Sequence, residues 1–286
     1  MGQEENGGTG TLYLCATPIG NLDDITLRVL ETLRSVDLIA AEDTRNTLKL
    51  LNHYDIHKPL TSYHEHNKYE KAAELIGHLL AGESIAVVTD AGTPAISDPG
   101  EVLAAQCMER GIRVTSLPGA CALITALTMS GMPARRFAFE GFLPAQKKER
   151  RRILEQLQRE ERTIILYEAP HHLRGTLQEL LEALGDRKIV LCRELTKRYE
   201  EALPLTLLTA ISYYEGQEPR GEYVLILAGA DPAARKQQQQ AAWEQISIAE
   251  HVTMYEQQGL DRKEAMKRAA LDRGISKRDV YRALLP

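Results

Sequence analysis

The chain has 286 residues, of which 43% are hydrophobic and 26% charged, and its formal net charge is −5. This length suits about two domains, and the composition is that of a soluble globular protein. The negative balance does not indicate a nucleic-acid partner, although a local basic patch can still bind one. Residues 1–10 are polar and glycine-rich, without the pattern of a signal peptide, and no apolar run reaches the roughly 18 residues of a membrane span. We therefore expect a cytoplasmic protein.

The four cysteines are far apart in the sequence, and no two of them form a C-x-x-C pair. This spacing argues against a zinc site or a disulfide framework. Cys15, Cys107 and Cys192 stand among apolar residues, so we expect them to be buried as small hydrophobic side chains. No metal site is predicted.

The first half of the chain alternates strand-like with helix-like segments, which predicts a parallel sheet with right-handed crossovers. The expected strands are Thr11–Thr17, Asp37–Ala41, Pro59–Tyr63, Ser84–Thr89 and Arg113–Leu117. The helices expected between them include Arg45–His53, Asn67–Leu80 and Glu101–Arg110. Pro118 and Gly119 then form an expected hinge, so the first α/β domain is predicted to span residues 11–118.

A second α/β domain is predicted over residues 119–231, with an antiparallel or mixed sheet. Its expected strands are Phe137–Phe142, Thr163–Tyr167, Lys188–Arg193 and Glu222–Leu227. Its expected helices are Ala120–Ser130, Glu149–Glu160, His172–Leu184 and Leu207–Glu215. Residues 233–240 include four consecutive glutamines and are expected to form a linker or an exposed helix. A small helical module at 241–286 follows, with helices at Ile246–Gln257, Arg262–Arg273 and Lys277–Leu284.

Two loops follow predicted strands in the first domain and have unusual composition. The segment Ser84–Gly100 runs from a buried strand into a tight loop of small residues, aspartates and prolines. The strand at Thr11–Thr17 likewise leads into the turn Pro18–Leu22. Either turn alone is an ordinary connection between a strand and a helix. Because ligands of open α/β sheets bind outside the carboxyl ends of the strands, the pair predicts a small-molecule site.

Several segments together carry a family resemblance. They are Ala16–Leu22, Ala41–Arg45, Ser62–Asn67, Thr89–Gly100, Ser116–Ala120 and Leu166–His171. In this order they resemble the tetrapyrrole methylase family of S-adenosylmethionine-dependent methyltransferases, over about Thr11 to Ala230. The resemblance implies two α/β domains, a parallel sheet and then a mixed one, with S-adenosylmethionine in the cleft between them. The absence of a G-x-G-x-x-G on the first turn weighs against a dinucleotide cofactor.

The resemblance also implies which residues hold the cofactor. Pro18 lies at the floor of the cleft, the loop around Gly92 meets the methionine part, and Val224 completes the adenine pocket. Many members of the family have Gly-Asp-Pro where this chain has Gly92-Thr93-Pro94, so Asp90 or Asp98 would supply the carboxylate. The expected set is Pro18, Asp90, Ala91, Gly92, Thr93, Ile96, Ser97, Asp98, Cys121, Ala122, Tyr167, Glu168, Ala169 and Val224.

Within the family, the chain is most similar to the branch that methylates ribosomal RNA. This implies 2′-O-methylation of a cytidine in the decoding region of 16S ribosomal RNA, free or in the small subunit, by a homodimer. A ribose hydroxyl is a poor nucleophile, so a proton acceptor should help. Our candidate catalytic residues are Asp43 as base or orienter, Arg45 as phosphate ligand and His64. The alternatives are that Asp43 or Thr44 only caps a helix and that His64 belongs to a solvated loop.

Basic residues in the second half are candidates for RNA contact, because RNA binding needs local positive charge. We expect contacts from Arg135, Lys147, Lys148, Arg150 and Arg151, with a solvated helix face as the alternative. In the predicted module, Asp261–Pro286 holds eight Lys and Arg against four Asp and Glu, which favours an RNA-docking element. Two other functions stay open: a methyltransferase for a tetrapyrrole-like small molecule, and an RNA-binding protein without catalysis.

Overall fold

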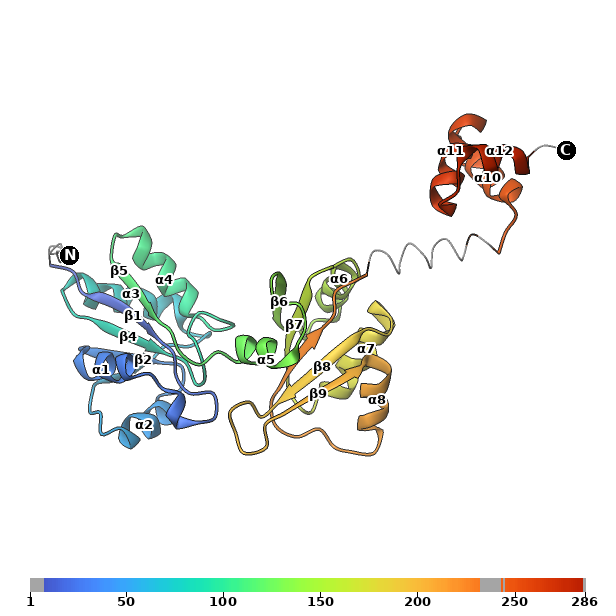
Figure 1. Cartoon of the computed structure of the whole chain (residues 1–286). Coiled ribbons are helices and arrows are strands. Elements are labelled where there is room, and N and C mark those ends of the chain that lie inside the picture. The colour runs from blue at the N-terminus through green and yellow to red at the C-terminus, as the bar shows by residue number, and fades with distance from the viewer. Residues whose placement is uncertain (1–7, 232–242, 244, 285–286) are drawn as a thin grey trace. The chain divides into compact units, whose positions relative to one another are not determined.

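The computed structural model describes residues 8–231, 243 and 245–284 and divides the chain into two compact units (Figure 1). One unit comprises Met1–Glu155 with Thr163–Ala228, and it contains both sheets. The other comprises Gln156–Arg162 with Gly229–Pro286, and it contains the C-terminal helices. The predicted linker at 233–240 lies outside the described residues. Within the described part of the chain, no helix has the length and apolar character needed to span a membrane.

The first sheet is parallel, as predicted, with strand order β3-β2-β4-β1-β5. Its strands are β1 (Thr11–Cys15), β2 (Leu38–Ala41), β3 (Leu60–Ser62), β4 (Ile85–Val88) and β5 (Arg113–Leu117). The connections contain the short 3-10 helix η1 (Leu22–Asp24) and the helices α1 (Leu27–Ser35), α2 (Thr44–His53), α3 (Lys68–Leu80) and α4 (Gly100–Glu109). The predicted elements are confirmed, with ends displaced by a few residues.

Helices cover both faces of this sheet, which explains why its central strands are apolar throughout. All four residues of β4 are buried. On one face, Leu75 and Leu79 of α3 belong to the same core as Leu103 of α4. On the other face, Leu33 of α1 and Leu51 of α2 join a second core. The polar loops after β1, β2 and β4 therefore meet at one edge of the sheet.

The second sheet is mixed, with strand order β6-β7-β10-β8-β9. Only the pair β6 and β7 is parallel. The strands are β6 (Phe137–Phe142), β7 (Thr163–Glu168), β8 (Lys188–Arg193), β9 (Glu201–Thr206) and β10 (Tyr223–Leu227). The helices are α5 (Ala122–Ser130), α6 (Lys147–Leu157), α7 (Leu173–Leu184) and α8 (Leu207–Glu215). Strand β9 was not predicted from the sequence.

Helix α5 packs on the second sheet directly after the predicted hinge. Its residues Leu123, Ala126 and Leu127 share a core with Val190 and Ile226 of that sheet. The helix ends at Gly131, whose positive φ of 65° gives the left-handed C-cap that glycine adopts most easily. The predicted burial of Cys15, Cys107 and Cys192 is confirmed, since all three side chains are fully inaccessible.

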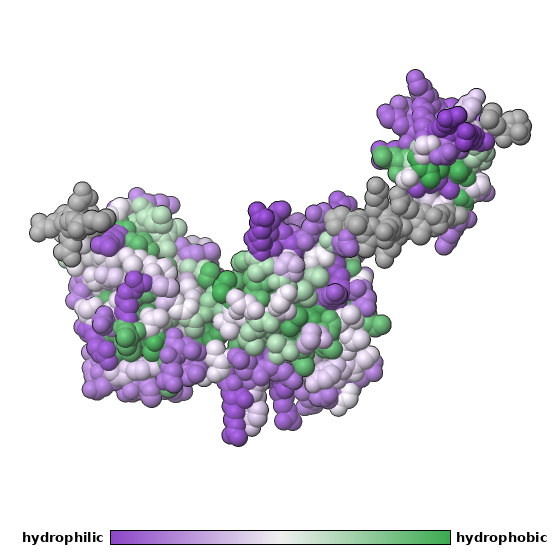
Figure 2. Space-filling view, viewed as in Figure 1, coloured by the Kyte–Doolittle hydropathy of each residue, from purple (hydrophilic) through white to green (hydrophobic). Residues whose placement is uncertain are grey.

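The C-terminal helices are α10 (Ile248–Gln257), α11 (Arg262–Arg273) and α12 (Lys277–Ala283), close to the predicted ranges. Ala265 and Ala269 of α11 pack with Val252 and Val280 in a small core. Alanine lets three short helices approach closely, so few residues suffice to bury this core. Figure 2 shows hydrophilic residues over much of the visible surface of these helices, beside a smaller apolar area.

Candidate active site

The two loops singled out in the sequence are joined by an antiparallel bridge. The Thr17 N–H donates to the Gly92 carbonyl at 2.8 Å, and the Gly92 N–H donates to the Thr17 carbonyl at 3.0 Å. The Thr17 hydroxyl also donates to the Thr89 carbonyl at 3.1 Å. Gly92 has a φ of +87°, which glycine adopts without strain. The strand ends of β1 and β4 are therefore held together as one platform.

The loop after β4 is kept in a strained shape by Asp98. Ala95 and Ser97 have φ values of +70° and +67°, which are rare for residues with a side chain. Asp98 Oδ1 accepts hydrogen bonds from the N–H groups of Ala95 at 2.8 Å and Gly100 at 2.9 Å. Burial raises the pKa of Asp98, and these two N–H groups oppose that rise. Strain of this kind is common at binding sites.

A cavity of about 600 Å³ opens beside this platform, with walls from both sheets. Its volume lies within the range that holds small-molecule ligands. Every residue predicted to hold the cofactor lines it except Pro18. The lining residues that were not predicted from the sequence are Ile19, Glu42, Thr89, Phe142, Pro170, Leu195, Glu222 and Tyr223. Glu42 follows β2 directly. The rule that ligands bind outside the carboxyl ends of the strands would therefore have predicted it.

The structure places Pro18 differently from the prediction. Its neighbour Ile19 lines the 600 Å³ cavity, whereas Pro18 lines a second cavity of about 390 Å³. Successive side chains of extended backbone point to opposite sides, and the chain is extended where Thr17 pairs with Gly92. The two cavities share Thr89 and Asp90, so Asp90 stands at their boundary.

The carboxylates Glu42 and Asp90 lie close together at the strand ends. Glu42 Oε2 accepts hydrogen bonds from the Thr89 hydroxyl at 2.6 Å and from the Asp90 N–H at 3.3 Å. Asp90 Oδ2 accepts a hydrogen bond from the Asn46 amide at 3.2 Å. Burial raises the pKa of Asp90, and the charges of Glu42 and Asp43 raise it further. Asp90 is therefore easier to protonate than an ordinary aspartate.

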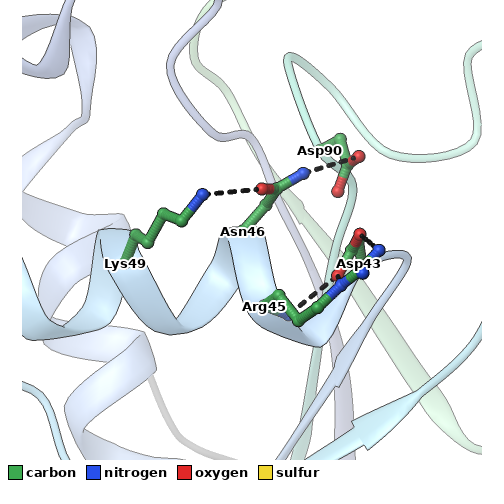
Figure 3. A network of polar contacts seen from close by, with 5 residues as sticks. All are labelled: Asp43, Arg45, Asn46, Lys49 and Asp90. Carbon is green, nitrogen blue, oxygen red and sulfur yellow. Dashed lines mark hydrogen bonds and ion pairs between the residues drawn. The ribbon is translucent and has the colours of Figure 1, made fainter.

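Asp43 and Arg45 bind each other and do not line the 600 Å³ cavity (Figure 3). Asp43 is the N-cap of α2 and accepts from the Arg45 N–H at 2.8 Å. The Arg45 guanidinium donates to both Asp43 oxygens, at 3.0 and 2.6 Å. These bonds lower the pKa of Asp43 to about 2. The capping role weighed as an alternative is confirmed, and so low a pKa makes Asp43 a poor proton acceptor.

His64 lies in the loop between β3 and α3 and is not part of the lining of the 600 Å³ cavity. Its N–H donates to Asn67 Oδ1 at 2.8 Å, so the loop is ordered locally. The neighbouring Tyr63 is buried and donates its hydroxyl to the Pro99 carbonyl at 2.8 Å. This segment therefore supports the loop after β4 through Tyr63, while His64 stays apart from the cavity wall.

The second sheet and its loops present an aromatic and backbone surface to the cavity. The Tyr167 ring meets Phe139 and Phe142 edge to face, with centroids 5.0 and 5.6 Å apart. Burial raises the pKa of Tyr167 to about 12, so it is neutral. Glu168 is 6% exposed, and its carboxylate accepts from the Ala169 N–H at 2.8 Å and from the Thr176 hydroxyl. Glu168 therefore fixes the loop after β7 by internal hydrogen bonds.

The basic residues predicted to contact RNA fall into two groups. Arg135, Lys147, Lys148 and Arg151 are exposed. The side chain of Arg151 is 83% accessible, whereas that of Arg150 is 18% accessible. The Arg150 guanidinium is bound to Glu179, to the Thr176 hydroxyl at 2.7 Å and to the Leu143 carbonyl at 3.4 Å. Arg150 thus joins α6 to α7, which the sequence run did not reveal.

The sequence is similar to those of known proteins over most of its length. The chain is 49% identical over 278 residues to the "Ribosomal RNA small subunit methyltransferase I" of Halalkalibacterium halodurans, covering 97% of this chain and 96% of the relative. A relative of the same name from Thermotoga maritima is 47% identical over 222 residues, which cover 78% of this chain and 100% of the relative.

Among solved structures, the uroporphyrin-III C-methyltransferase of Thermus thermophilus complexed with S-adenosylhomocysteine has a similar fold. Its TM-score is 0.54 at 19% identity, over 77% of this chain and 97% of that one. The sequence also matches the family "Tetrapyrrole (Corrin/Porphyrin) Methylases" over residues 11–211, from the start of β1 into α8. The chain therefore belongs to the tetrapyrrole methylase family.

Proposed function

We propose that the chain binds S-adenosylmethionine in the 600 Å³ cavity and methylates ribosomal RNA of the small subunit, at the 2′-hydroxyl of a cytidine. The observation that carries the proposal is this cavity, formed by both sheets in a chain that resembles named small-subunit ribosomal RNA methyltransferases along nearly its whole length. The similar fold of a protein bound to S-adenosylhomocysteine supports the choice of cofactor.

The residues of the cavity fit this cofactor. Ile19, Ile96 and Val224 offer apolar surface for the adenine ring, while carboxylates offer partners for hydroxyl and ammonium groups. Gly92 lines the cavity, and this position favours glycine, because a Cβ there would press on Ile19 Cγ2 at 3.3 Å and the left-handed φ disfavours a side chain. The bound cofactor supplies a methyl group on a sulfonium centre.

The protein then has to position the acceptor hydroxyl and receive its proton. Five carboxylates line the cavity: Glu42, Asp90, Asp98, Glu168 and Glu222. Asp98 Oδ1 is already engaged by two backbone N–H groups, and Glu42 Oε2 by Thr89 and Asp90. Glu168 accepts from the Ala169 N–H and the Thr176 hydroxyl, and Glu222 from the Lys197 ammonium. Asp90 alone of the five also lines the neighbouring cavity, so it is the carboxylate best placed to meet an incoming hydroxyl.

Exposed cations provide the RNA surface in this proposal. Arg135, Lys147, Lys148 and Arg151 of the second domain are accessible, and the basic C-terminal helices add a second surface. Arg150 is left out because its guanidinium binds inside the domain. We further propose that the protein works in the bacterial cytoplasm as a homodimer, for which light scattering of the purified protein is the direct measurement.

Transfer of tritiated methyl groups to small subunits that lack the modification tests the proposal. We expect label in 16S ribosomal RNA and, after digestion, in 2′-O-methylcytidine. Label on a base atom would overturn the 2′-O assignment, and label in a tetrapyrrole with none in RNA would overturn the RNA substrate. Titration calorimetry with S-adenosylmethionine, on the wild type and on Asp90→Asn, checks the cofactor cavity separately.

A further inference from the structure

The second cavity, of about 390 Å³, has a chemical character different from that of the cofactor cavity. It lies between the turn after β1 and one side of α2, and it reaches Asp90 at the boundary. Its walls contain two basic side chains, Lys49 and His53, and apolar carbons of Leu22 and Leu50. Small-molecule sites combine an apolar wall with a few polar groups in this way.

Three residues of the wall of this cavity, Lys49, Asn46 and Asp90, form a line of polar contacts (Figure 3). Lys49 Nζ lies 3.5 Å from Asn46 Oδ1, and the Asn46 amide donates to Asp90 Oδ2 at 3.2 Å. The amide of Asn46 is thus oriented by its two neighbours, with its oxygen toward the ammonium and its nitrogen toward the carboxylate. Asn46 thereby holds Asp90 at the boundary of the two cavities.

The ammonium of Lys49 is available to an anion. Among the ion pairs of the described residues none involves Lys49, whereas the nearby Arg45 is bound to Asp43. Lys49 is exposed, and within the described part of the chain its ammonium has one hydrogen bond, to Asn46 Oδ1 at the limiting length of 3.5 Å. A phosphate group is the anion that an RNA substrate brings into such a pocket.

We infer that this second cavity is the acceptor subsite and takes one unstacked nucleotide of the RNA. Its phosphate binds Lys49, its base lies against Leu22 and Leu50, and its ribose points toward Asp90 and the cofactor cavity. Proteins read RNA at such splayed-out nucleotides, because their faces and edges are accessible. The inference rests on the proposed function and adds to it the position of the substrate.

The first test measures binding of unmodified small subunits in the presence of S-adenosylhomocysteine at several potassium chloride concentrations. We expect Lys49→Gln to weaken binding about 3- to 10-fold and to reduce the slope of log K against log salt by about 0.7 to 0.9, the loss of one phosphate contact. Lys49→Arg should keep the slope. Lys58→Gln is the matched control, because Lys58 precedes β3 at the opposite edge of the sheet.

The second test fills the cavity. Leu22 is 41% exposed and does not line the cofactor cavity, so Leu22→Trp should fold and bind S-adenosylmethionine with unchanged affinity. We expect kcat/KM for small subunits to fall at least 10-fold. Wild-type affinity and salt slope in Lys49→Gln, or full activity in Leu22→Trp, would overturn the subsite while leaving the proposed function intact. A wild-type protein that transfers no methyl group to RNA would instead overturn the proposed function.

Discussion

Thr17 and Gly92 exchange two backbone hydrogen bonds, of 2.8 and 3.0 Å, although they are 75 positions apart in the chain numbering. The bridge joins the loop after β1 to the loop after β4. Through its hydroxyl, Thr93 then reaches the Ala120 carbonyl at 3.0 Å, at the start of the second domain. The floor of the cavity proposed for the cofactor is therefore held together by hydrogen bonds between these loops, and its shape depends on the conformation of Gly92.

Replacing Gly92 by alanine should distort this floor. The φ of +87° is unfavourable for alanine, and the new Cβ would press on Ile19 Cγ2 at 3.3 Å. We expect a loss of stability of about 1–2 kcal/mol and a fall in S-adenosylmethionine affinity of at least 10-fold. Thermal unfolding and titration calorimetry measure the two effects.

Gly111→Ala is the control for backbone strain alone. Gly111 has a φ of +68°, and a Cβ there would meet no atom within 4 Å. This variant should lose comparable stability and keep full cofactor affinity. Equal cofactor affinity in the two variants would contradict the role given to Gly92.

Strand periodicity predicted the parallel sheet because its central strands are buried on both faces, as β4 shows. The edge strand β9 gave no such signal. Its sequence Glu-Ala-Leu-Pro-Leu-Thr contains Pro204, and proline is accepted only at an edge or a bulge of a sheet. Its pairing with β8 fixes it, with Pro204 opposite Val190. The pairing with β8 therefore makes this segment a strand, and the residue pattern within β9 alone does not reveal it.

The candidate site was predictable where it depends on backbone and strand ends, as for Gly92 and Val224. It was not predictable where a side chain has several possible hydrogen-bond or ion-pair partners. Asp43 follows β2 next to Glu42, but only Glu42 faces the cavity, because Asp43 caps α2 and binds Arg45. The charge run around Arg150 could not reveal which cation turns inward, since that choice depends on Glu179 and Thr176 of a distant helix.

The neighbouring arginines 150 and 151 should give opposite phenotypes. Arg150→Gln breaks a partly buried group of charged hydrogen bonds, so it should lower the stability by about 1–3 kcal/mol. Arg151→Gln removes an 83% exposed side chain whose ion pair with Glu155 contributes little. It should keep the wild-type melting temperature and bind small subunits about 2- to 5-fold more weakly. Chemical unfolding and filter binding of both variants distinguish the roles, and equal stabilities would contradict the assignment.

Cations on the last helix should contribute to RNA affinity without affecting the cofactor. Lys277, Arg278 and Arg282 are exposed on α12. Neutralising all three to glutamine should weaken binding of small subunits about 10-fold or more and lower the salt slope by roughly 2. S-adenosylmethionine affinity should not change. The charge-preserving swap Lys277→Arg, Arg278→Lys and Arg282→Lys is the control.

We expect the cations of α12 to increase the rate of methyl transfer to small subunits, while methyl transfer itself does not require them. The Thermotoga maritima relative, a named ribosomal RNA small subunit methyltransferase, matches 78% of this chain over its own full length, so about a fifth of this chain has no counterpart in that relative. Residual methyl transfer to small subunits should therefore survive in the triple glutamine variant. Complete loss of transfer, or wild-type binding, would show that the last helix has another role.

His251 should make the stability of the C-terminal helices depend on pH. The ring is fully buried, and the Arg273 Nε–H donates to its Nδ1 at 3.1 Å. Because arginine can only donate, Nδ1 must be unprotonated and the ring is neutral, with its proton on Nε2 facing Asp272 at 3.6 Å. Burial and then the charge of Arg273 lower the pKa of His251, and Asp272 partly opposes this.

A lowered pKa in the folded state means that the unfolded chain binds more protons in this range. The free energy of unfolding of these helices is therefore at its full value above the ordinary histidine pKa of about 6.5, and it falls as the pH decreases through that value toward the lower folded pKa. Trp243, the only tryptophan, stacks on His251 with ring centroids 3.8 Å apart, so its fluorescence reports directly on the ring.

We expect Trp243 fluorescence to drop on acidification with a midpoint below pH 6.5, and the thermal midpoint that it reports to decrease from pH 7.5 to pH 5.5. His251→Gln should remove both dependences, since glutamine can accept from Arg273 without titrating. His57→Gln is the control, because the His57 side chain is 78% exposed. A midpoint at or above 6.5 in the folded protein would mean that Asp272 outweighs burial and Arg273, and the sign of the pH dependence would then reverse.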